Sequence, residues 1–384
     1  MQGSECCQWR GKPTIRSKRS EICCTNRPAA DEVVVCCGFA NDSFRKNTKS
    51  PSNGDAMENT CYGLGRHSER LCAMAINQGA FPAASADLFL VYVGMETDLI
   101  FNRGVELPGF ASYPLLESAG GQEFLRGYLT DMVTLAKDTG TGVILESPTW
   151  VANRDRAAAL GYTPKALKEL NQRAIALMQD VRTANSHMPT IISANLGPRD
   201  DAYKPSEQMT AEESERYHSE QISFLAETDV DVISGYTIAY PAEAVGIVRA
   251  AQRFELRVVI AFTVETNGRL PTGISLEDAI SQVDAATDGY PAYFMINCAH
   301  PEHFNSVLED APWMQRIRGI VANASRCSHA ELDEAEELDD GNPTELGTQL
   351  AEIRRRFPHI QALGGCCGTD MRHMAQIAKA ARAT

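Results

Sequence analysis

From residue 86 to the end of the chain, short apolar runs alternate with longer stretches in which apolar residues recur about every three or four positions. A short, almost unbroken apolar run is typical of a strand buried on both faces, and the longer period is typical of a helix packed by one face. The pattern predicts strands at residues 88–94, 142–147, 190–196, 231–237, 257–263, 292–298, 317–324 and 359–365.

The segments between these runs carry the end signals of helices. Thr163 stands directly before Pro164, and Asn342 directly before Pro343. This is the order expected of a capping side chain followed by proline in the first helical turn. Gly140 closes another amphipathic segment, as expected at a helix end.

Strands buried on both faces and separated by helices pair in parallel. Eight such units in about 300 residues match a closed (β/α)8 TIM barrel better than an open, doubly wound sheet. No G-x-G-x-x-G follows the first predicted strand, so the usual reason for choosing the open sheet is missing. We therefore predict an α/β fold, a (β/α)8 TIM barrel over residues 86–384, with its active site at the carboxyl ends of the strands.

Residues 1–85 differ from the rest of the chain in charge and cysteine content. They hold 11 Lys and Arg against 8 Asp and Glu, whereas residues 86–384 hold 25 against 42. Eight of the twelve cysteines lie there, yet no recognised metal-ligand spacing and no sustained apolar period appears. We expect a disordered or processed N-terminal extension; a targeting peptide, a disulfide framework or a metal cluster are the alternatives.

The overall charge and hydropathy exclude some classes of partner. A formal net charge of −14 disfavours nucleic acid and anionic membrane surfaces. The longest apolar runs are far shorter than the roughly 20 residues of a membrane-spanning helix. We therefore expect no nucleic-acid partner and no membrane partner.

Three of the four cysteines outside the extension fall at predicted strand ends. Cys298 ends the sixth strand, and Cys366 and Cys367 follow the eighth in the sequence LGGCCGTD (363–370). Three thiolates can hold a zinc ion and leave its fourth position open, and the glycines of that sequence tolerate the unusual φ/ψ values of a sharp turn. Buried structural cysteines, or a disulfide between the neighbouring Cys366 and Cys367, are the alternatives.

Other stretches extend this pattern. They are GMETDLIFNRGVELPGFASYPLLES after the first predicted strand, ESPTW at the second, SANLGP at the third and ANASRCSHAELDEAEELDDGNPTELG after the seventh. With GGCCGT, and with INC about seventy residues upstream of it, they make residues 88–382 resemble the homocysteine S-methyltransferase family, zinc-dependent barrels of the betaine–homocysteine methyltransferase type.

The resemblance implies that Cys298, Cys366 and Cys367 bind Zn²⁺ and that the substrate thiol takes the fourth position. Zinc would keep that thiol deprotonated near neutral pH, where a free thiol with a pKa near 8.5 is mostly protonated. The implied reaction, a step of methionine biosynthesis, moves a methyl group to homocysteine or a related thiol. The implied donor is a sulfonium, S-methylmethionine or S-adenosylmethionine, or a betaine-like ammonium.

Two positions depart from the family's pattern. Tyr92-Val93 stands where the family usually has Asp-Gly, and Tyr236 stands where it tends to have a carboxylate after the fourth strand. In the family those acidic residues help to hold the amino group of homocysteine, and an unpaired charge in a pocket is costly. Glu96 and Glu146, each near a strand end, are the candidates to replace them. The alternative is that both are structural carboxylates.

Asn297, directly before Cys298, is expected to orient the substrate or a neighbouring group, with a simple loop hydrogen bond as the alternative. His300 and His303 are expected to be solvated residues at a helix start, because three thiolates and a substrate already fill a tetrahedral zinc site. The predicted substrate-binding residues are thus Glu96, Glu146, Asn297 and Tyr236.

The segment from Ser328 to Asp340 has seven acidic residues among thirteen. Ser328 and Glu331 form a capping-box pattern, which predicts a surface helix. A lid over the site that attracts a cationic donor is the other interpretation. Cys327 is expected to be structural.

These features together predict a methyltransferase whose partners are a small-molecule thiol acceptor and a methyl donor. The alternative is a non-catalytic or altered-specificity zinc barrel of the same family, favoured by Tyr92 and Tyr236. A cytoplasmic location is expected because the thiolates must stay reduced, unless the N-terminal extension directs the chain to an organelle. The sequence leaves the oligomeric state open.

Overall fold

The computed structural model describes residues 86–205 and 207–383. The N-terminal extension expected over residues 1–85 lies outside the described residues.

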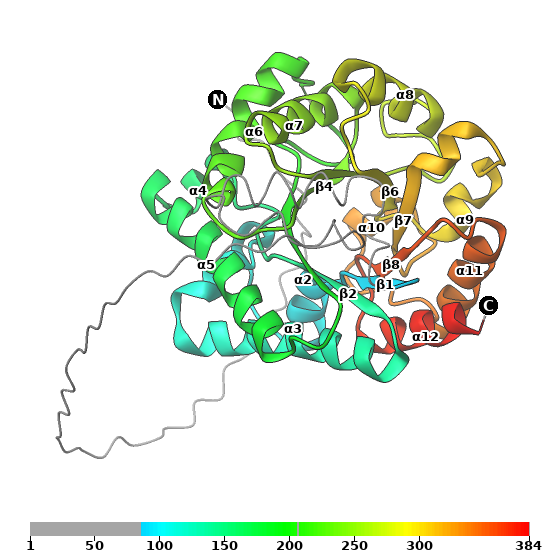
Figure 1. The fold of residues 1–384 in the computed structure, drawn as a ribbon, viewed down its shortest axis with the longest axis horizontal. Helices are drawn as coiled ribbons and strands as arrows, with labels where there is room; N and C mark the ends of the chain where they lie inside the picture. Colours follow the sequence, from blue (N-terminus) through cyan, green and yellow to red (C-terminus); the bar gives the residue numbers. More distant parts are fainter. Residues whose placement is uncertain (1–85, 206, 384) are drawn as a thin grey trace, which may run out of the picture. The chain divides into compact units, whose positions relative to one another are not determined.

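Eight parallel strands close into a barrel in the described part of the chain (Figure 1). Each strand pairs with the next along the sequence and the last pairs with the first. The predicted (β/α)8 barrel is confirmed. The strands are β1 (Phe89–Val91), β2 (Gly142–Glu146), β3 (Thr190–Leu196), β4 (Val232–Ile238), β5 (Val258–Phe262), β6 (Tyr293–Asn297), β7 (Ile317–Ala322) and β8 (Ala362–Gly365).

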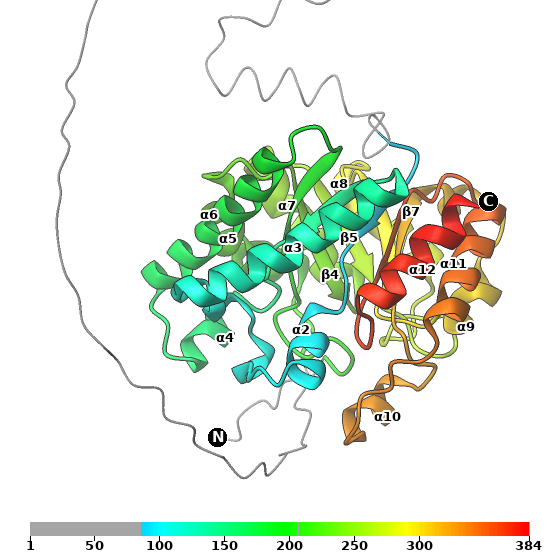
Figure 2. The same ribbon diagram turned by 90° about the horizontal axis from the view of Figure 1, so that it is seen from below.

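Helices surround the barrel and cover its outer face (Figures 1 and 2). The longer ones are α3 (Ala119–Thr139), α5 (Pro164–Ala184), α6 (Ala211–Ala226), α7 (Pro241–Arg253), α8 (Leu276–Thr287), α11 (Pro343–Arg356) and α12 (Met371–Arg382). The short ones are α2 (Met95–Thr97), α4 (Arg154–Ala159), α9 (Pro301–Phe304), α10 (His329–Glu334), the π-helix η1 (Asp98–Asn102) and the 3₁₀ turns η2 (Pro108–Phe110), η3 (Tyr113–Glu117), η4 (Asn305–Val307) and η5 (Pro312–Arg316). Figure 2 shows α2, α4 and α10 at the same side of the barrel. They follow the carboxyl ends of β1, β2 and β7 in the chain.

The predicted helix caps are present. The Thr163 side chain accepts from the backbone amide of Ala166 at 3.3 Å, and α5 begins at the next residue, a proline. Asn342 accepts from the amide of Thr344 at 3.0 Å at the start of α11. Gly140 follows α3 with a φ of 65°, the left-handed conformation that glycine adopts without penalty.

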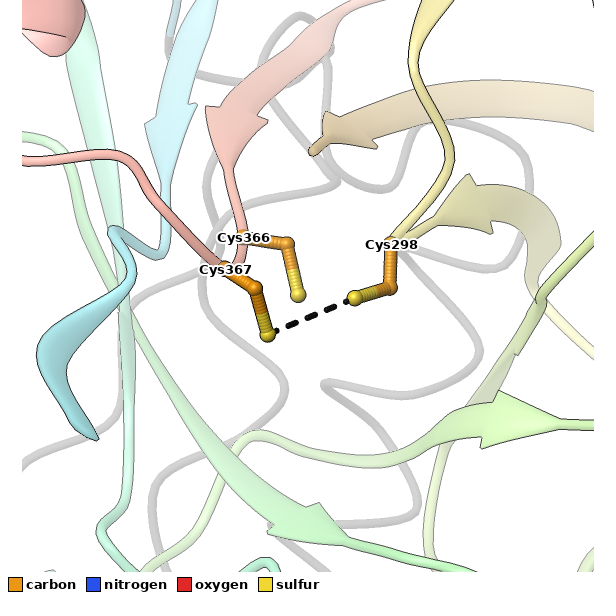
Figure 3. Close-up of side chains that lie close together, drawn as sticks. All are labelled: Cys298, Cys366 and Cys367. Atoms are coloured by element: carbon orange, nitrogen blue, oxygen red, sulfur yellow. Dashed lines mark hydrogen bonds between the residues drawn. The ribbon is translucent and has the colours of Figure 1, made fainter. Parts of the chain in front are cut away.

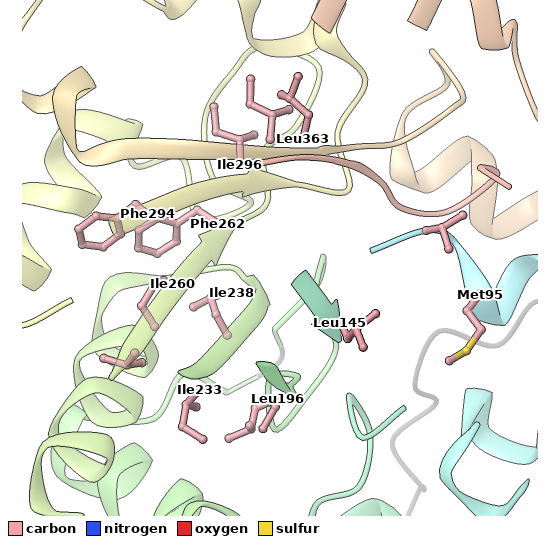
Figure 4. Packing of buried hydrophobic residues seen from close by; sticks show 14 of the residues in the cluster. Met95, Leu145, Leu196, Ile233, Ile238, Ile260, Phe262, Phe294, Ile296 and Leu363 are labelled. Atoms are coloured by element: carbon pink, nitrogen blue, oxygen red, sulfur yellow. The ribbon is translucent and has the colours of Figure 1, made fainter. Parts of the chain in front are cut away.

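Buried apolar side chains form two layers because successive residues of a strand point to opposite faces. The outer layer packs the strands against the helices, as Ile260, Phe262, Ile296 and Leu363 do in Figure 4. The inner layer fills the barrel with side chains of alternating strand positions: Phe89, Val91, Ile144, Val232, Tyr236, Val259, Ala261, Tyr293, Met295, Val321 and Ala362, together with Cys298 and Cys366. Cys298 and Cys366 therefore belong to the packed interior of the barrel, at the carboxyl ends of β6 and β8.

The first strand is shorter than the apolar pattern predicted. It stops at Val91, because Tyr92 has a φ of 40° and the amide of Met95 turns back to the carbonyl of Val93. The apolar residues after Val91 therefore belong to a tight turn into α2. Among the described residues, no helix has the length and apolar character that crossing a membrane requires.

Candidate metal centre and substrate cavity

The three predicted ligands come together at the carboxyl ends of β6 and β8. Cys298 directly follows β6, and Cys366 and Cys367 directly follow β8. Their sulfur atoms all lie within 4.8 Å of one another, and the Sγ atoms of Cys298 and Cys367 are 3.5 Å apart (Figure 3). All three are free thiols, so the alternative of a disulfide between the neighbouring cysteines is absent here.

Close backbone packing shapes the turn after β8. Thr369 Oγ1 donates to the carbonyl oxygen of Cys366 at 2.7 Å and accepts from the amide of Gly94 at 3.0 Å. A Cβ atom at Gly94 would overlap the Cys366 carbonyl oxygen, and one at Gly365 would overlap the Thr369 side chain. Of the glycines in LGGCCGTD only Gly368 has a positive φ, +77°. Gly364 and Gly365 have ordinary φ values, but neighbouring atoms approach them too closely for a Cβ atom. This use of the two glycines differs from the predicted one, which was to allow unusual φ/ψ values.

Cys298 is held from several sides. Its φ of 52° is uncommon for a residue with a side chain. The Cys298 amide donates to the carbonyl of Val321 at 2.9 Å, and the Cys298 carbonyl accepts from Nε2 of His329 at 2.7 Å. At the sulfur, Tyr203 Oη donates at 3.1 Å and Asn323 Nδ2 lies 3.7 Å away. These contacts fix the direction in which the thiol points.

The three thiols perturb one another's ionisation. Hydrogen bonds from Cys366 and Cys367 lower the pKa of the Cys298 thiol, with Tyr203 and His329 acting in the same direction. The interaction with Cys298 and burial raise the pKa of Cys366 and Cys367. Buried thiols this close cannot all become thiolates unless a cation compensates their charge. The donor set is therefore suited to a metal ion that prefers sulfur ligands.

A cavity of about 390 Å³, open to solvent, lies against the cysteines. Its aromatic lining consists of Tyr92, Phe110, Trp150, Tyr203 and Tyr236, and its polar lining of Glu96, Thr97, Asn195, Thr237 and Asn297. Among the described residues, no lysine, arginine or histidine side chain borders it. The described lining therefore combines aromatic faces with uncharged polar groups and one carboxylate, and it carries no fixed positive charge.

Tyr92 and Tyr236, the two residues that depart from the family's pattern, each form a hydrogen bond with one of the two candidate glutamates. Tyr92 Oη donates to Glu96, which also accepts from Ser112 Oγ at 2.8 Å. Tyr236 Oη donates to Glu146 Oε1 at 3.1 Å, and the two tyrosine ring centroids are 5.9 Å apart. Each substituted position thus lies beside a carboxylate supplied from elsewhere in the chain.

The two glutamates differ in access to the cavity. Both are buried, at 4% and 5% exposure, but Glu96 borders the cavity and Glu146 is not among its described lining residues. Burial raises the pKa of Glu96 above its ordinary value and that of Glu146 to about 8. The other oxygen of Glu146, Oε2, is buried without a hydrogen-bond partner among the described residues. Glu146 is therefore linked to the cavity by its hydrogen bond with Tyr236, which is part of the lining.

Asn297, the last residue of β6, lines the cavity and also holds the end of β4, two strands away in the barrel. Its Oδ1 accepts from the amide of Thr237 at 2.9 Å, and its Nδ2 donates to the hydroxyl of the same residue at 2.9 Å. Thr237 has a φ of 61°, so this pair of bonds stabilises an otherwise unfavourable backbone. Both polar ends of Asn297 are engaged in this contact.

The model of the family described as homocysteine S-methyltransferase matches residues 95–381. This chain belongs to that family. It is therefore a methyltransferase, and the resemblance noted in the sequence is confirmed. No curated protein sequence matches the chain.

Solved structures of the homocysteine methyltransferase MmuM from Escherichia coli are similar to this family member. The oxidized form has a TM-score of 0.60 at 19% identity and covers 76% of this chain and 96% of that chain. The metallated form has a TM-score of 0.57 at 18% identity, covering 79% and 98%. The apo form has a TM-score of 0.55 at 19% identity, covering 78% and 98%. At these identities the likeness shows the shared fold.

In this methyltransferase the two histidines after Cys298 are not solvated, and that expectation was wrong. His300 caps α9 and is 2% exposed, and His303 is 8% exposed. The loop after β7 covers them, since Nε2 of His303 donates to the carbonyl of Arg326 at 2.8 Å. Burial lowers the pKa of His300 to about 4. Neither belongs to the cluster of possible metal ligands among the described residues.

The acidic segment begins as predicted, with a capping box of Ser328 and Glu331 at the start of α10. Its first helical residue, His329, stacks on the ring of Tyr203 with centroids 3.8 Å apart. The segment therefore reaches the cavity wall, although whether it opens and closes stays a prediction. Cys327 is partly buried and free, with its sulfur 4.0 Å from Asp339.

Several site residues were not found from the sequence. Asn195 lies in β3 and Tyr203 in the loop after β3. Trp150 lies in the loop after β2, and Phe110 in the long connection after β1. Asn195 stands at a predicted strand end and, like Trp150 and Phe110, lies in one of the stretches that resemble the family, so these three carried a signal. Tyr203 lies in an irregular loop, whose course the apolar pattern does not predict.

Proposed function

We propose that this methyltransferase binds zinc through Cys298, Cys366 and Cys367 and transfers a methyl group from a cationic donor to the sulfur of homocysteine or a related thiol. In that transfer a bond forms between the acceptor sulfur and the methyl carbon. The bond from that carbon to the positively charged atom of the donor breaks, and its electron pair stays with the donor, which leaves neutral. The observation that carries the proposal is the cluster of three free thiols beside a cavity at the barrel's carboxyl end.

The donor set fits zinc better than a hard cation. Zinc takes sulfur ligands in a tetrahedron, and catalytic zinc sites usually have three protein ligands and one open position. Magnesium and calcium take oxygen ligands, and no carboxylate joins the three sulfurs in the cluster of possible ligands among the described residues. A bound zinc ion would stabilise the acceptor thiol as a thiolate.

The chain's own residues would orient both substrates. Tyr203 and Asn323 direct the Cys298 sulfur, and Thr369 anchors the turn that carries the other two cysteines. Holding two reactants in a fixed geometry removes much of the entropic barrier of a bimolecular step. The rigid strand ends would therefore hold the two substrates in the orientation that methyl transfer requires.

The lining of the cavity supports a cationic donor. Aromatic faces attract onium groups. Five aromatic side chains border this cavity, and its lining within residues 86–205 and 207–383 includes no basic residue. A sulfonium such as S-methylmethionine or S-adenosylmethionine and a betaine-like ammonium share this chemistry. The lining thus favours the donor class without distinguishing its members.

For the acceptor, Glu96 is the proposed partner of an amino group, because it is the carboxylate that borders the cavity. Tyr236, with Glu146 behind it, would contribute the tyrosine hydroxyl oxygen as an acceptor. Asn195 adds a buried Oδ1 that has no hydrogen-bond partner within the described part of the chain and could accept an N–H of the substrate. Asn297 would act on the substrate's surroundings through Thr237.

The test is calorimetric binding of L-homocysteine to the zinc-loaded full-length protein, with L-methionine as the control ligand. Zinc-dependent binding with proton release is expected for homocysteine and none for methionine. Cys366→Ser should lose both zinc and methyl transfer, because one of three protein ligands is removed. Full methyl transfer by this variant would refute the proposed zinc site.

A change of acceptor within the same chemistry is the second candidate, favoured by Tyr92 and Tyr236. Stoichiometric zinc without homocysteine binding, together with methyl transfer to another thiol in a donor–acceptor screen, would establish it. A protein that binds zinc but transfers a methyl group to no thiol would be a non-catalytic relative.

A further inference from the structure

The three cysteines of the cluster are not equivalent in their surroundings. Side-chain donors outside the cluster reach only the sulfur of Cys298 among the described hydrogen bonds: the Tyr203 hydroxyl at 3.1 Å and the Asn323 amide at 3.7 Å. Cys298 is also the most deeply buried, at 1% exposure against 7% for Cys366, while Cys367 is partly exposed. All three cysteines border the cavity, but only the sulfur of Cys298 has these side-chain donors among the described residues, and Cys298 is the most enclosed.

Tyr203 is itself rigidly placed. Its ring lies over the imidazole of His329, with centroids 3.8 Å apart and an angle of 26° between the planes. That imidazole is fixed at both nitrogens, by the Cys298 carbonyl at 2.7 Å and by Glu265 at 3.3 Å. The amides of Tyr203 and of the next residue both donate to Asp201 Oδ1 at 2.8 Å. The hydroxyl therefore stays aimed at the sulfur without help from a substrate.

An onium donor brought into this cavity meets several sulfur nucleophiles. A hydrogen bond to a thiolate lowers its basicity, and thiolate nucleophilicity falls with basicity. Methylation of a protein cysteine would form a bond from its sulfur to the methyl carbon, with the donor again leaving as a neutral molecule. Such a thioether would no longer be an anionic metal ligand, so the reaction would inactivate the site.

We propose that Tyr203 is a positioning residue that, together with Asn323, makes Cys298 the anchoring and unreactive sulfur of the cluster. This inference rests on the proposed zinc-dependent methyl transfer. Reactivity toward alkylating agents then follows the order Cys367, Cys366, Cys298. His329 acts through Tyr203 by holding its ring.

The test compares the zinc-loaded wild type with Tyr203→Phe, which keeps the ring on His329 and removes only the hydroxyl. Each protein is treated with iodoacetamide, and carbamidomethylation at Cys298 and Cys367 is followed by peptide mass spectrometry. Removing one charge-assisted hydrogen bond makes the Cys298 sulfur a stronger nucleophile, and with a Brønsted slope near 0.45 its alkylation rate should rise about three- to tenfold. We expect that increase at Cys298 relative to Cys367.

The matched control is Tyr162→Phe, which removes a tyrosine hydroxyl that donates to Glu117 at 2.7 Å and bonds to no cysteine among the described hydrogen bonds. It should leave the alkylation ratio unchanged. Cobalt substitution gives a second readout, because the thiolate-to-metal charge-transfer absorption should shift in Tyr203→Phe and not in Tyr162→Phe.

An unchanged ratio of Cys298 to Cys367 alkylation in zinc-loaded Tyr203→Phe would overturn the inference. Loss of zinc from that variant would overturn it as well, because Tyr203 would then be needed to hold the metal. The alkylation ratio requires neither a methyl donor nor an acceptor, so it can fail while methyl transfer by the wild type succeeds. The reverse outcome, no methyl transfer with the expected ratio, would refute the proposed function alone.

Discussion

Gly94 is the point at which the turn after β1 meets the cysteine turn after β8. A Cβ atom there would overlap the carbonyl oxygen of Cys366 and lie 2.9 Å from both the carbonyl oxygen of Thr369 and the hydroxyl of Thr97. Its φ of −62° is open to alanine, so any effect of Gly94→Ala arises from overlap. Two of the three atoms are backbone and cannot rotate away.

The expected cost follows from the size of the overlap. Forcing one extra methyl group into a packed site costs about 1–3 kcal/mol. For a domain of about 300 residues, with an unfolding entropy of about 2.1 cal/mol/K per residue, this lowers Tm by about 2–5 °C. The strain is relieved most easily by moving the Cys366 turn, so zinc affinity should fall by up to about 100-fold. Thermal unfolding and a competition titration with a chromogenic zinc chelator measure the two effects.

Gly120→Ala is the matched control, because position 120 lies in α3 and a Cβ atom there meets nothing within 4 Å. It should raise Tm slightly, since alanine favours a helix over glycine by about 1 kcal/mol, and leave zinc affinity unchanged. If Gly94→Ala kept both the Tm and the zinc affinity of the wild type, the packing argument for this turn would be wrong.

Two further predictions concern ionisation and oxidation. Burial raises the pKa of Glu146 from 4.5 to about 8, so the folded state holds this proton more tightly than the unfolded chain. The free energy of unfolding should therefore fall by up to about 1.4 kcal/mol per pH unit as the pH rises from 4.5 toward 8. Glu146→Gln should remove this contribution to the slope, which urea titrations at several pH values measure. Equal slopes in the wild type and the variant would contradict the prediction. In metal-free protein, mild oxidation should join Cys298 to Cys367, whose sulfurs are 3.5 Å apart, and a Cys366–Cys367 disulfide in peptide maps would contradict this.

The sequence alone determined the class of fold and the three candidate metal ligands. Buried parallel strands need apolar side chains on both faces, and this local requirement is visible in every predicted strand. Helix caps such as Thr163 and Asn342 bond to amides only two or three residues away, so they too could be recognised from the sequence. Cys298, Cys366 and Cys367 stood at strand ends, and a closed barrel brings such ends to one rim.

The tertiary structure decided how the residues around that rim are used. His300 and His303 were expected in solvent, but a loop more than twenty residues further along the chain buries them. Glu146 appeared equivalent to Glu96, but in the closed barrel Glu146 does not line the cavity and bonds instead to Tyr236, which does. Tyr203 reaches Cys298 across 95 positions of sequence. Contacts of this kind depend on the course of loops and on packing between distant segments, for which the local pattern of apolar and polar residues carries no information.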